Sequence, residues 1–467
     1  MSTVQAVPLR DSGSNRRFFG HPTGLAYLAF TEAWERFSYY GMSALLVLYM
    51  VNQLLLPGHI EHVAGFAAFR GVIEGAFGPL STQALASQIF GLYSGFVYFT
   101  PVLGGWLGDR IGQRNAVVLG ALSMSGGHLA MAFDQSFLLA LLLLIMGSGL
   151  LKGNISAQVG SVYPPDDEER RTRGFALFST GINFGAVAGP LLCGFLGERY
   201  GWHFGFGAAA LFMLGALATY LSGYRHLPAR VTRKARAAAA PLTTNDFKII
   251  AALVAAMAIT VLPYIAYYQL ANVLPVWLQE HGNMHAGSFE VPIPWFQSID
   301  PLFSIVGLPL LFALWAWQGR GSGREPTEMI KIACGGFICG GANLILVAAI
   351  AAYGSGKVLW VWPFLFCAVQ GLGFMYMWPP LLALVSRCAP PKINSTMMGA
   401  SFLTLFVANN LIGWIGTFYE KMTPVAFWTL HAGIGAAGGF LALLFAQSFG
   451  RILEPGPSSD SAHLEVR

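Results

Sequence analysis

The sequence contains little charge. Only 10% of its 467 residues are charged, which is less than half of the share usual in a soluble domain. Together with 55% hydrophobic residues and a mean hydropathy of +0.56, this excludes an ordinary soluble domain and indicates an integral membrane protein. In such a chain the net charge of +5 reflects basic cytoplasmic loops, so it does not indicate a nucleic-acid partner.

Cysteine is also scarce. The five cysteines lie in or beside apolar segments, and their number is odd. Their spacing predicts neither a disulfide framework nor a bound metal. The apolar segments also lack a nucleophile and a base at the spacing that an enzyme needs, so we expect a protein that is not an enzyme.

Long apolar runs are abundant. Runs of about 20 residues, enough to cross about 30 Å of hydrocarbon, recur along the whole chain. They predict an all-α membrane protein with twelve spans, at 24–54, 84–108, 115–133, 137–161, 175–198, 203–223, 247–278, 295–317, 328–353, 358–385, 397–418 and 425–450. A glycine in the middle of many runs fits close packing between membrane helices.

The basic residues predict the orientation. Loops on one side and the two tails hold 21 Lys and Arg residues, whereas the opposite loops hold four. This asymmetry places both termini in the cytoplasm and predicts a multi-pass protein of the cell inner membrane. The predicted domains are a tail (1–23), a six-helix bundle (24–223), a linker (224–246), a second six-helix bundle (247–450) and a tail (451–467), with a central cavity between the bundles.

Three charges stand in the first apolar run, within TEAWERFSYYG (31–41). Glu32, Glu35 and Arg36 are spaced three and four apart, so they share one helical face. Each charge in mid-membrane costs about 2.5–3.5 kcal/mol on insertion scales and indicates a functional residue with a partner. A static ion cluster that holds helices together is the alternative, but it leaves one carboxylate without a cation.

Lys152, in GLLKGNIS of the fourth span, supplies the missing positive charge. Two carboxylates and two cations then sum to zero. A carboxylate that is freed by protonation, or by a competing substrate carboxylate, acts as a switch. This pattern predicts transport driven by the proton gradient, without a cofactor.

These motifs resemble a known family. TEAWERFSYYG and GLLKGNIS are similar to the ExxERFxYYG and GxxKPNxS segments of the proton-dependent oligopeptide transporters, a branch of the major facilitator superfamily. GGWLGDRIGQR (104–114) and FSTGINFGAVAGPLLCG (178–194) resemble further family segments. The resemblance implies uptake of di- and tripeptides with protons. It implies a proton-coupling cluster of Glu32, Glu35, Arg36 and Lys152, and a peptide pocket in which Arg36 and Lys152 join Tyr39, Tyr40 and Asn183.

The second half departs from the family pattern. Tyr268 stands where the seventh span of the family has a glutamate, and Phe374 stands where the tenth span has one. Asp300, in FQSIDPLF, replaces a family asparagine. We expect Asp300 to contact the peptide amine, with capping of the eighth span as the alternative.

Further residues complete the predicted sites. We expect the substrate site to include Tyr268, Gln269, Asn272 and Trp378, and the loop residues Asp109, Arg110 and Arg114 to gate the two halves rather than only set topology. Asn154 and Asn183 either face the cavity or pair helices. The segment 56–80 forms a surface helix or a packed lid.

The predicted function is proton-coupled import of small peptides by a monomer in the lipid bilayer. The alternative keeps the fold and the proton coupling but moves another small cargo, an anion or a peptide-like metabolite, because two family acids are absent. A receptor that binds without transport is a weaker prediction, since the sequence has no appended sensory domain.

Overall fold

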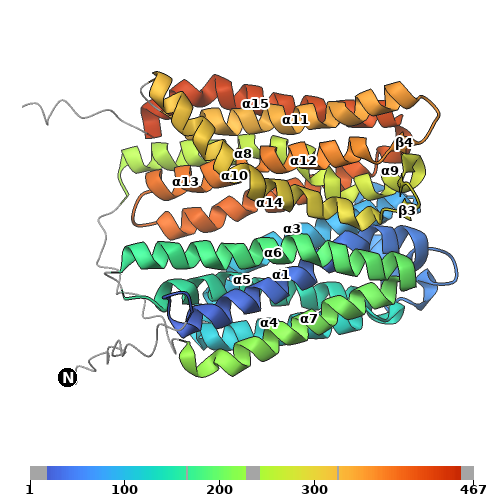
Figure 1. Ribbon diagram of the computed structural model, residues 1–467, viewed down its shortest axis with the longest axis horizontal. Helices are drawn as coiled ribbons and strands as arrows, with labels where there is room; N and C mark the ends of the chain where they lie inside the picture. The colour runs from blue at the N-terminus through green and yellow to red at the C-terminus, as the bar shows by residue number, and fades with distance from the viewer. Residues whose placement is uncertain (1–17, 165–166, 228–241, 323–324, 454–467) are drawn as a thin grey trace, which may run out of the picture.

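Long helices that run side by side make up the protein (Figure 1). The computed structural model describes residues 18–164, 167–227, 242–322 and 325–453. The predicted tails lie largely outside these residues, and so does most of the predicted linker. The first half contains α1 (Thr23–Tyr49), η2 (Met50–Leu54), η3 (Ile60–His62), α2 (Phe66–Phe77), α3 (Thr82–Ile111), α4 (Gln113–Ala130), η4 (Asp134–Ser136), α5 (Phe137–Ser161), α6 (Glu168–Tyr200), α7 (Trp202–Gly223) and η5 (Tyr224–His226).

The second half repeats this helical pattern. It contains α8 (Thr244–Asn272), α9 (Leu274–His281), η6 (Ile293–Trp295), α10 (Phe296–Ser322), α11 (Glu328–Tyr353), α12 (Val361–Met375), α13 (Trp378–Cys388), α14 (Asn394–Gly416), η7 (Tyr419–Lys421) and α15 (Pro424–Leu453). Short strands join its loops: β1 (Gly282–Asn283) pairs in parallel with β4 (Val358–Leu359), and β2 (His285–Ala286) pairs antiparallel with β3 (Phe289–Glu290).

Nine helical segments of the described residues are long and apolar enough to cross a membrane. They start with the segment that contains α5 and include every later long helix. The other three predicted spans, 24–54, 84–108 and 115–133, coincide with α1, α3 and α4. The protein is therefore a helical multi-pass membrane protein, while the count of twelve crossings stays a prediction.

Two predicted spans are each broken into two helices. The span predicted at 247–278 divides at Val273, directly before Leu274 and Pro275, and the span at 358–385 divides before Trp378 and Pro379. Proline has no N–H and its ring clashes with the preceding turn, so it fits best in the first turn of a helix, where Pro275 and Pro379 lie. These breaks correct the single helices that hydropathy predicted.

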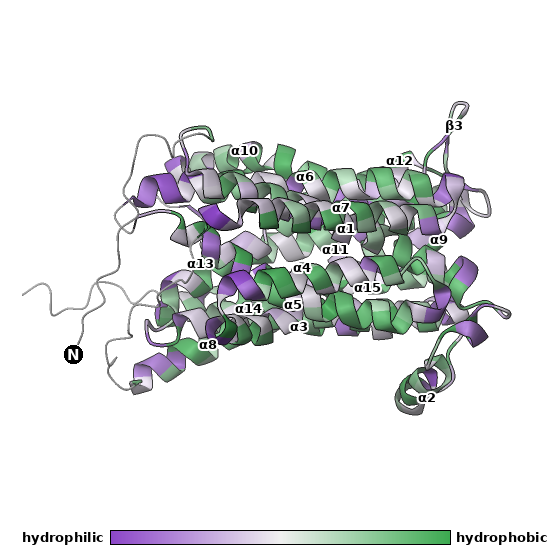
Figure 2. Cartoon of the chain, turned by 90° about the horizontal axis from the view of Figure 1, so that it is seen from below, coloured by the Kyte–Doolittle hydropathy of each residue, from purple (hydrophilic) through white to green (hydrophobic). Residues whose placement is uncertain are grey.

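The helices gather into two bundles (Figure 1). One bundle contains α1 and α3–α7, the other contains α8 and α10–α15. We call the end of the molecule that carries α2 and α9 the α2 end, and the opposite end, near residues 18 and 453, the terminal end. Hydrophilic residues gather mostly near these two ends, and α2 stands apart from the bundles (Figure 2). The predicted helix in the segment 56–80 is therefore present.

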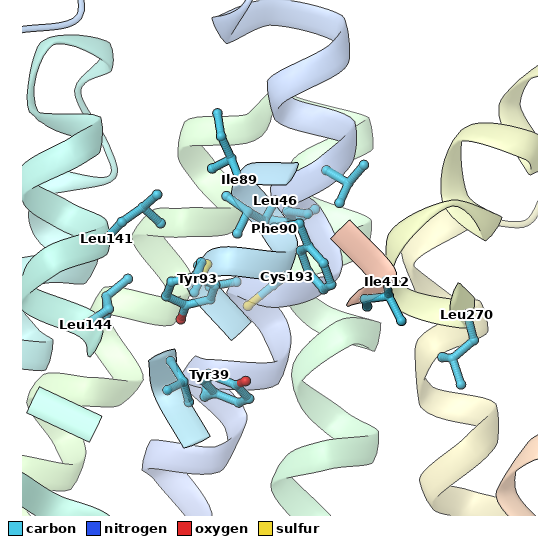
Figure 3. Packing of buried hydrophobic residues seen from close by; sticks show 14 of the residues in the cluster. Tyr39, Leu46, Ile89, Phe90, Tyr93, Leu141, Leu144, Cys193, Leu270 and Ile412 are labelled. Atoms are coloured by element: carbon cyan, nitrogen blue, oxygen red, sulfur yellow. The ribbon is translucent and has the colours of Figure 1, made fainter. Parts of the chain in front are cut away.

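The bundles meet most closely where α3 crosses α14. A Cβ added to Gly91 would lie 2.6 Å from the Asn409 carbonyl oxygen and 2.6 Å from the Gly413 Cα. Glycine at this crossing lets the two backbones touch. Buried apolar side chains surround the crossing, with Ile89, Phe90 and Ile412 among them (Figure 3).

Candidate functional site

The charged residues of α1 form a buried cluster. The Arg36 Nε lies 3.1 Å from Glu32 Oε1 and also pairs with Glu35 Oε2. Glu32 is 4% exposed, Glu35 0% and Arg36 6%. One guanidinium thus serves two carboxylates, and the unpartnered buried oxygens include Glu32 Oε2. The three α1 residues alone have one negative charge in excess, and an unbalanced buried carboxylate is costly unless it takes up a proton or another cation.

Lys152 on α5 lies against aromatic rings. Its Nζ is 4.7 Å from the ring centroid of Tyr39 and 5.1 Å from that of Tyr98, at the distance of cation–π contacts. Within the described residues, its ammonium makes no ion pair with a carboxylate. The partnership of Lys152 with the α1 cluster thus involves no direct ion pair to Glu32 or Glu35 among the described residues. Tyr39 connects the two groups instead, because the Arg36 Cζ lies 5.5 Å from the same ring.

A second ionisable group lies in the other bundle. The Tyr267 hydroxyl on α8 donates a 2.6 Å hydrogen bond to Asp300 Oδ2, and the Tyr267 ring stacks on Phe374 with centroids 5.2 Å apart. Asp300 Oδ1 is buried without a hydrogen-bond partner. Asp300 is the fifth residue of α10, inside the helix, so the alternative that it caps this helix is wrong.

One tyrosine pair links the two bundles at this level. The Tyr268 hydroxyl on α8 donates to the Tyr98 hydroxyl on α3 at 3.3 Å. Tyr98 also contacts Lys152 of its own bundle. It therefore connects Lys152 in the first bundle with Tyr268 in the second. Sequence reasoning missed Tyr98. A tyrosine inside an apolar run carries no mark that separates it from packing residues.

Two candidate substrate residues lie in a helix contact instead. Gln269 and Asn272 are both 0% exposed. Their side-chain amides donate to the Ile412 carbonyl of α14, at 3.3 and 3.0 Å. The structure thus places them between α8 and α14, and not with Lys152 or Asp300. Asn154 likewise pairs helices, because its amide donates to the Gly104 carbonyl of α3 at 3.0 Å.

The remaining candidates of the substrate site are Tyr40, Trp378 and Asn183. Tyr40 packs edge-on against Tyr39, with ring centroids 5.1 Å apart. Trp378 packs against Tyr264 at 6.4 Å. Both Tyr40 and Trp378 are half-buried, as is Asn183 on α6.

The three candidate gating residues lie near the terminal end. Arg110 stacks over the Trp106 ring, with its Cζ 3.8 Å from the centroid. Arg114 lies 4.7 Å from the Tyr224 ring. Both arginines thus contact residues of their own bundle. The gating role of Asp109 remains a prediction.

Hydrogen bonds between the bundles lie toward the α2 end. The side-chain amides of Asn52 and Gln279 bond each other twice, at 3.1 and 3.0 Å. The Ser298 hydroxyl donates to the Val187 carbonyl at 2.7 Å, and the Ile293 N–H donates to Glu198 at 3.0 Å. These bonds lie nearer the α2 end than the terminal end. The α2 end is therefore closed.

Known proteins are similar to this chain in sequence and in fold. A sequence profile of the Major Facilitator Superfamily matches residues 29–413. The chain belongs to the Major Facilitator Superfamily. A curated superfamily relative, the uncharacterized transporter YclF of Bacillus subtilis (strain 168), is 29% identical over 95% of this chain and 98% of its own length. The di-/tripeptide transporter of Lactococcus lactis subsp. cremoris is 28% identical over 92% and 96%.

A solved structure agrees with the fold. The crystal structure of a peptide transporter POT in complex with sulfate has a TM-score of 0.81 and 27% identity, over 94% of this chain and 97% of that one. The resemblance to the proton-dependent oligopeptide transporter branch of the superfamily, predicted from the α1 motif, is confirmed by these relatives. The family and its neighbours are transporters and not enzymes, so this chain is a membrane transporter.

Proposed function

We propose that this superfamily member imports di- and tripeptides together with protons by alternating access. The observation that carries the proposal is the arrangement of charge. A carboxylate-rich cluster in α1 and the aromatic-caged Lys152 belong to one bundle, and Asp300 belongs to the other. A zwitterionic peptide that bridges the bundles meets a cation for its carboxylate and an anion for its ammonium.

Proton coupling is proposed for the α1 cluster. Glu32 and Glu35 share one arginine, so the three α1 residues have one negative charge in excess, which either a proton or the Lys152 ammonium compensates. A peptide carboxylate that approaches Arg36 or Lys152 competes with these glutamates for the cations and favours that protonation. Tyr39 contacts both cations, so it connects binding of the peptide carboxylate with protonation of the glutamates. In this proposal Tyr40, Asn183, Tyr268 and Trp378 form the walls of the pocket.

The proposed topology has twelve crossings in two bundles, residues 24–223 and 247–450, in the inner membrane. Both termini lie in the cytoplasm, so the α2 end faces outward. The cross-bundle hydrogen bonds toward that end support an inward-facing state of a monomeric transporter. Opening to the outside then requires the α3–α14 crossing and the Asn52–Gln279 pair to separate.

Uptake of labelled dialanine into proteoliposomes tests this function. With an imposed pH gradient, acidic outside, we expect accumulation above the external concentration, and collapse of the gradient by a protonophore should abolish it. Counterflow without a gradient should persist. Absence of both processes from correctly inserted protein would refute the peptide cargo.

The absence of two family acids favours an anion as the alternative cargo. Tyr268 and Phe374 stand where family acids are expected, while Lys152 has no carboxylate partner within the described residues. A small anion or an anionic peptide-like metabolite fits such a site, and sulfate is bound in the similar solved structure. Dialanine that fails to compete with uptake of such an anion would support this alternative.

A further inference from the structure

Among the residues that the structure describes, none that faces Asp300 is a cation. The titratable groups that face it come from five helices, and all of them are neutral at ordinary pH. They are Tyr267 on α8, Tyr40 on α1, Tyr98 on α3, Cys339 on α11 and Cys367 on α12. α6 also packs against α10, but within the described residues it presents no charged or titratable side chain to Asp300.

The two oxygens of Asp300 differ. Oδ2 accepts the Tyr267 hydroxyl at 2.6 Å, whereas Oδ1 is buried without any partner. α12 packs directly on this part of α10, since a Cβ on Gly371 would meet the Asp300 carbonyl, and the Ser304 hydroxyl donates to the Gly371 carbonyl at 2.9 Å. Asp300 is therefore held in place by α8 and α12. Its Oδ1 is available to a proton or to a hydrogen-bond donor of a ligand.

A carboxylate in this position needs a positive partner. When it is ionised, Oδ1 carries negative charge in a buried position without a hydrogen bond or an ion pair from the described residues, which is costly. A proton on the free oxygen removes this cost, and so does an ammonium group of a bound ligand. The two are mutually exclusive occupants of the same oxygen.

We propose that Asp300 is a proton–ammonium exchange site, in which the amino group of an arriving substrate displaces a proton from the acid. This inference rests on the proposed peptide function and deepens it. In the exchange, the O–H bond of the protonated acid breaks and its proton leaves to water in the substrate pathway. The carboxylate then accepts hydrogen bonds from the substrate ammonium, and charge is conserved.

The exchange gives the two bundles opposite responses to the same peptide. Its carboxylate end favours proton uptake by the α1 cluster, whereas its ammonium end drives proton release at Asp300. A substrate without an amino group leaves the Asp300 proton in place. The site therefore favours ligands with a free ammonium group, because only these gain a charge-assisted hydrogen bond to Asp300.

Tyr267 is the positioning residue for this exchange. Its hydrogen bond stabilises the ionised form of Asp300 and leaves Oδ1 free. Tyr267→Phe removes that stabilisation, so the protonated acid persists to higher pH. From the strength of a hydrogen bond to a charged group, the midpoint of proton release should rise by roughly one to two pH units.

Calorimetric titration of the purified full-length transporter with dialanine tests the proposal. At mildly acidic pH, the binding heat is measured in buffers of different ionisation enthalpy, and its slope gives the protons released. We expect Asp300→Asn to release about one proton fewer per peptide than the unmodified chain. N-acetylated dialanine, which has no ammonium group, should show the same reduced release with the unmodified chain.

Two tyrosine variants provide the matched comparison. Tyr264→Phe alters a buried tyrosine one turn before Tyr267 whose hydroxyl has no partner, so the pH curve of proton release should not move. Tyr267→Phe should shift it upward, and this test remains valid if Asp300→Asn fails to fold. Equal proton release by Asp300→Asn and the unmodified chain would refute the exchange while leaving the peptide cargo intact. No dialanine binding at all would refute the cargo and the exchange together.

Discussion

Gly91→Ala should open the closed α2 end. The added methyl would lie 2.6 Å from both the Asn409 carbonyl oxygen and the Gly413 Cα, which are backbone atoms of α14. Non-bonded carbon atoms prefer a separation of about 3.5–4.0 Å, so α3 and α14 must move apart by about 1 Å. Overpacking of this kind typically costs about 1–3 kcal/mol. If the open state relieves the strain, the closed-to-open ratio falls by roughly 5- to 150-fold.

Pulsed electron paramagnetic resonance measures this shift. Spin labels on cysteines introduced at Arg199 and Lys421, both exposed at the α2 end of different bundles, report the separation of the two bundles. The accessible Cys334 and Cys388 are replaced by serine in this experiment. We expect a longer distance to gain population in Gly91→Ala.

Gly105→Ala is the matched control. It places the same methyl on the same helix, where nothing lies within 4 Å. An unchanged distance distribution in Gly91→Ala would show that the crossing does not hold the α2 end closed. An equal shift in Gly105→Ala would show that helix propensity, and not the contact, is responsible.

Two further predictions concern the α1 cluster and the α2 segment. Glu32→Gln and Glu35→Gln should each reduce proton-driven uptake by at least about tenfold while counterflow persists, and the α1 assignment is wrong if both variants accumulate substrate normally. The Leu80 N–H and the Arg70 guanidinium hold the pKa of Glu74 below its usual 4.5. Because the ionised form stabilises the end of α2, protease cleavage of this segment should stay slow above that value and accelerate as pH falls through the lowered pKa; Glu74→Gln should remove this dependence.

Hydropathy and one motif predicted much of the fold. Apolar runs of spanning length predicted each long helix because a membrane helix needs little more than length and apolarity. The breaks in two spans were missed, although Pro275 and Pro379 mark them, because proline is common within membrane helices and only the packing decides whether it starts a new one.

The site was predicted less evenly. The α1 cluster was recognisable because charge in an apolar run is expensive. Gln269 and Asn154 could not be assigned in this way, since an amide in an apolar run either faces a pocket or bonds a neighbouring backbone, and the sequence does not distinguish the two. Tyr98 was missed because its importance comes from contacts with α5 and α8, which are distant in the sequence.

The link between Tyr98 and Tyr268 bears on how fast the transporter turns over. Where two bundles are joined by a buried ion pair, separating them leaves charges exposed to a poor solvent, at a cost of about 3–5 kcal/mol. Here the Tyr98–Tyr268 bond at the depth of the site joins neutral hydroxyls and is worth about 0.5–1.5 kcal/mol. Rocking between states at this level therefore has a low electrostatic barrier and a rate that ionic strength hardly changes.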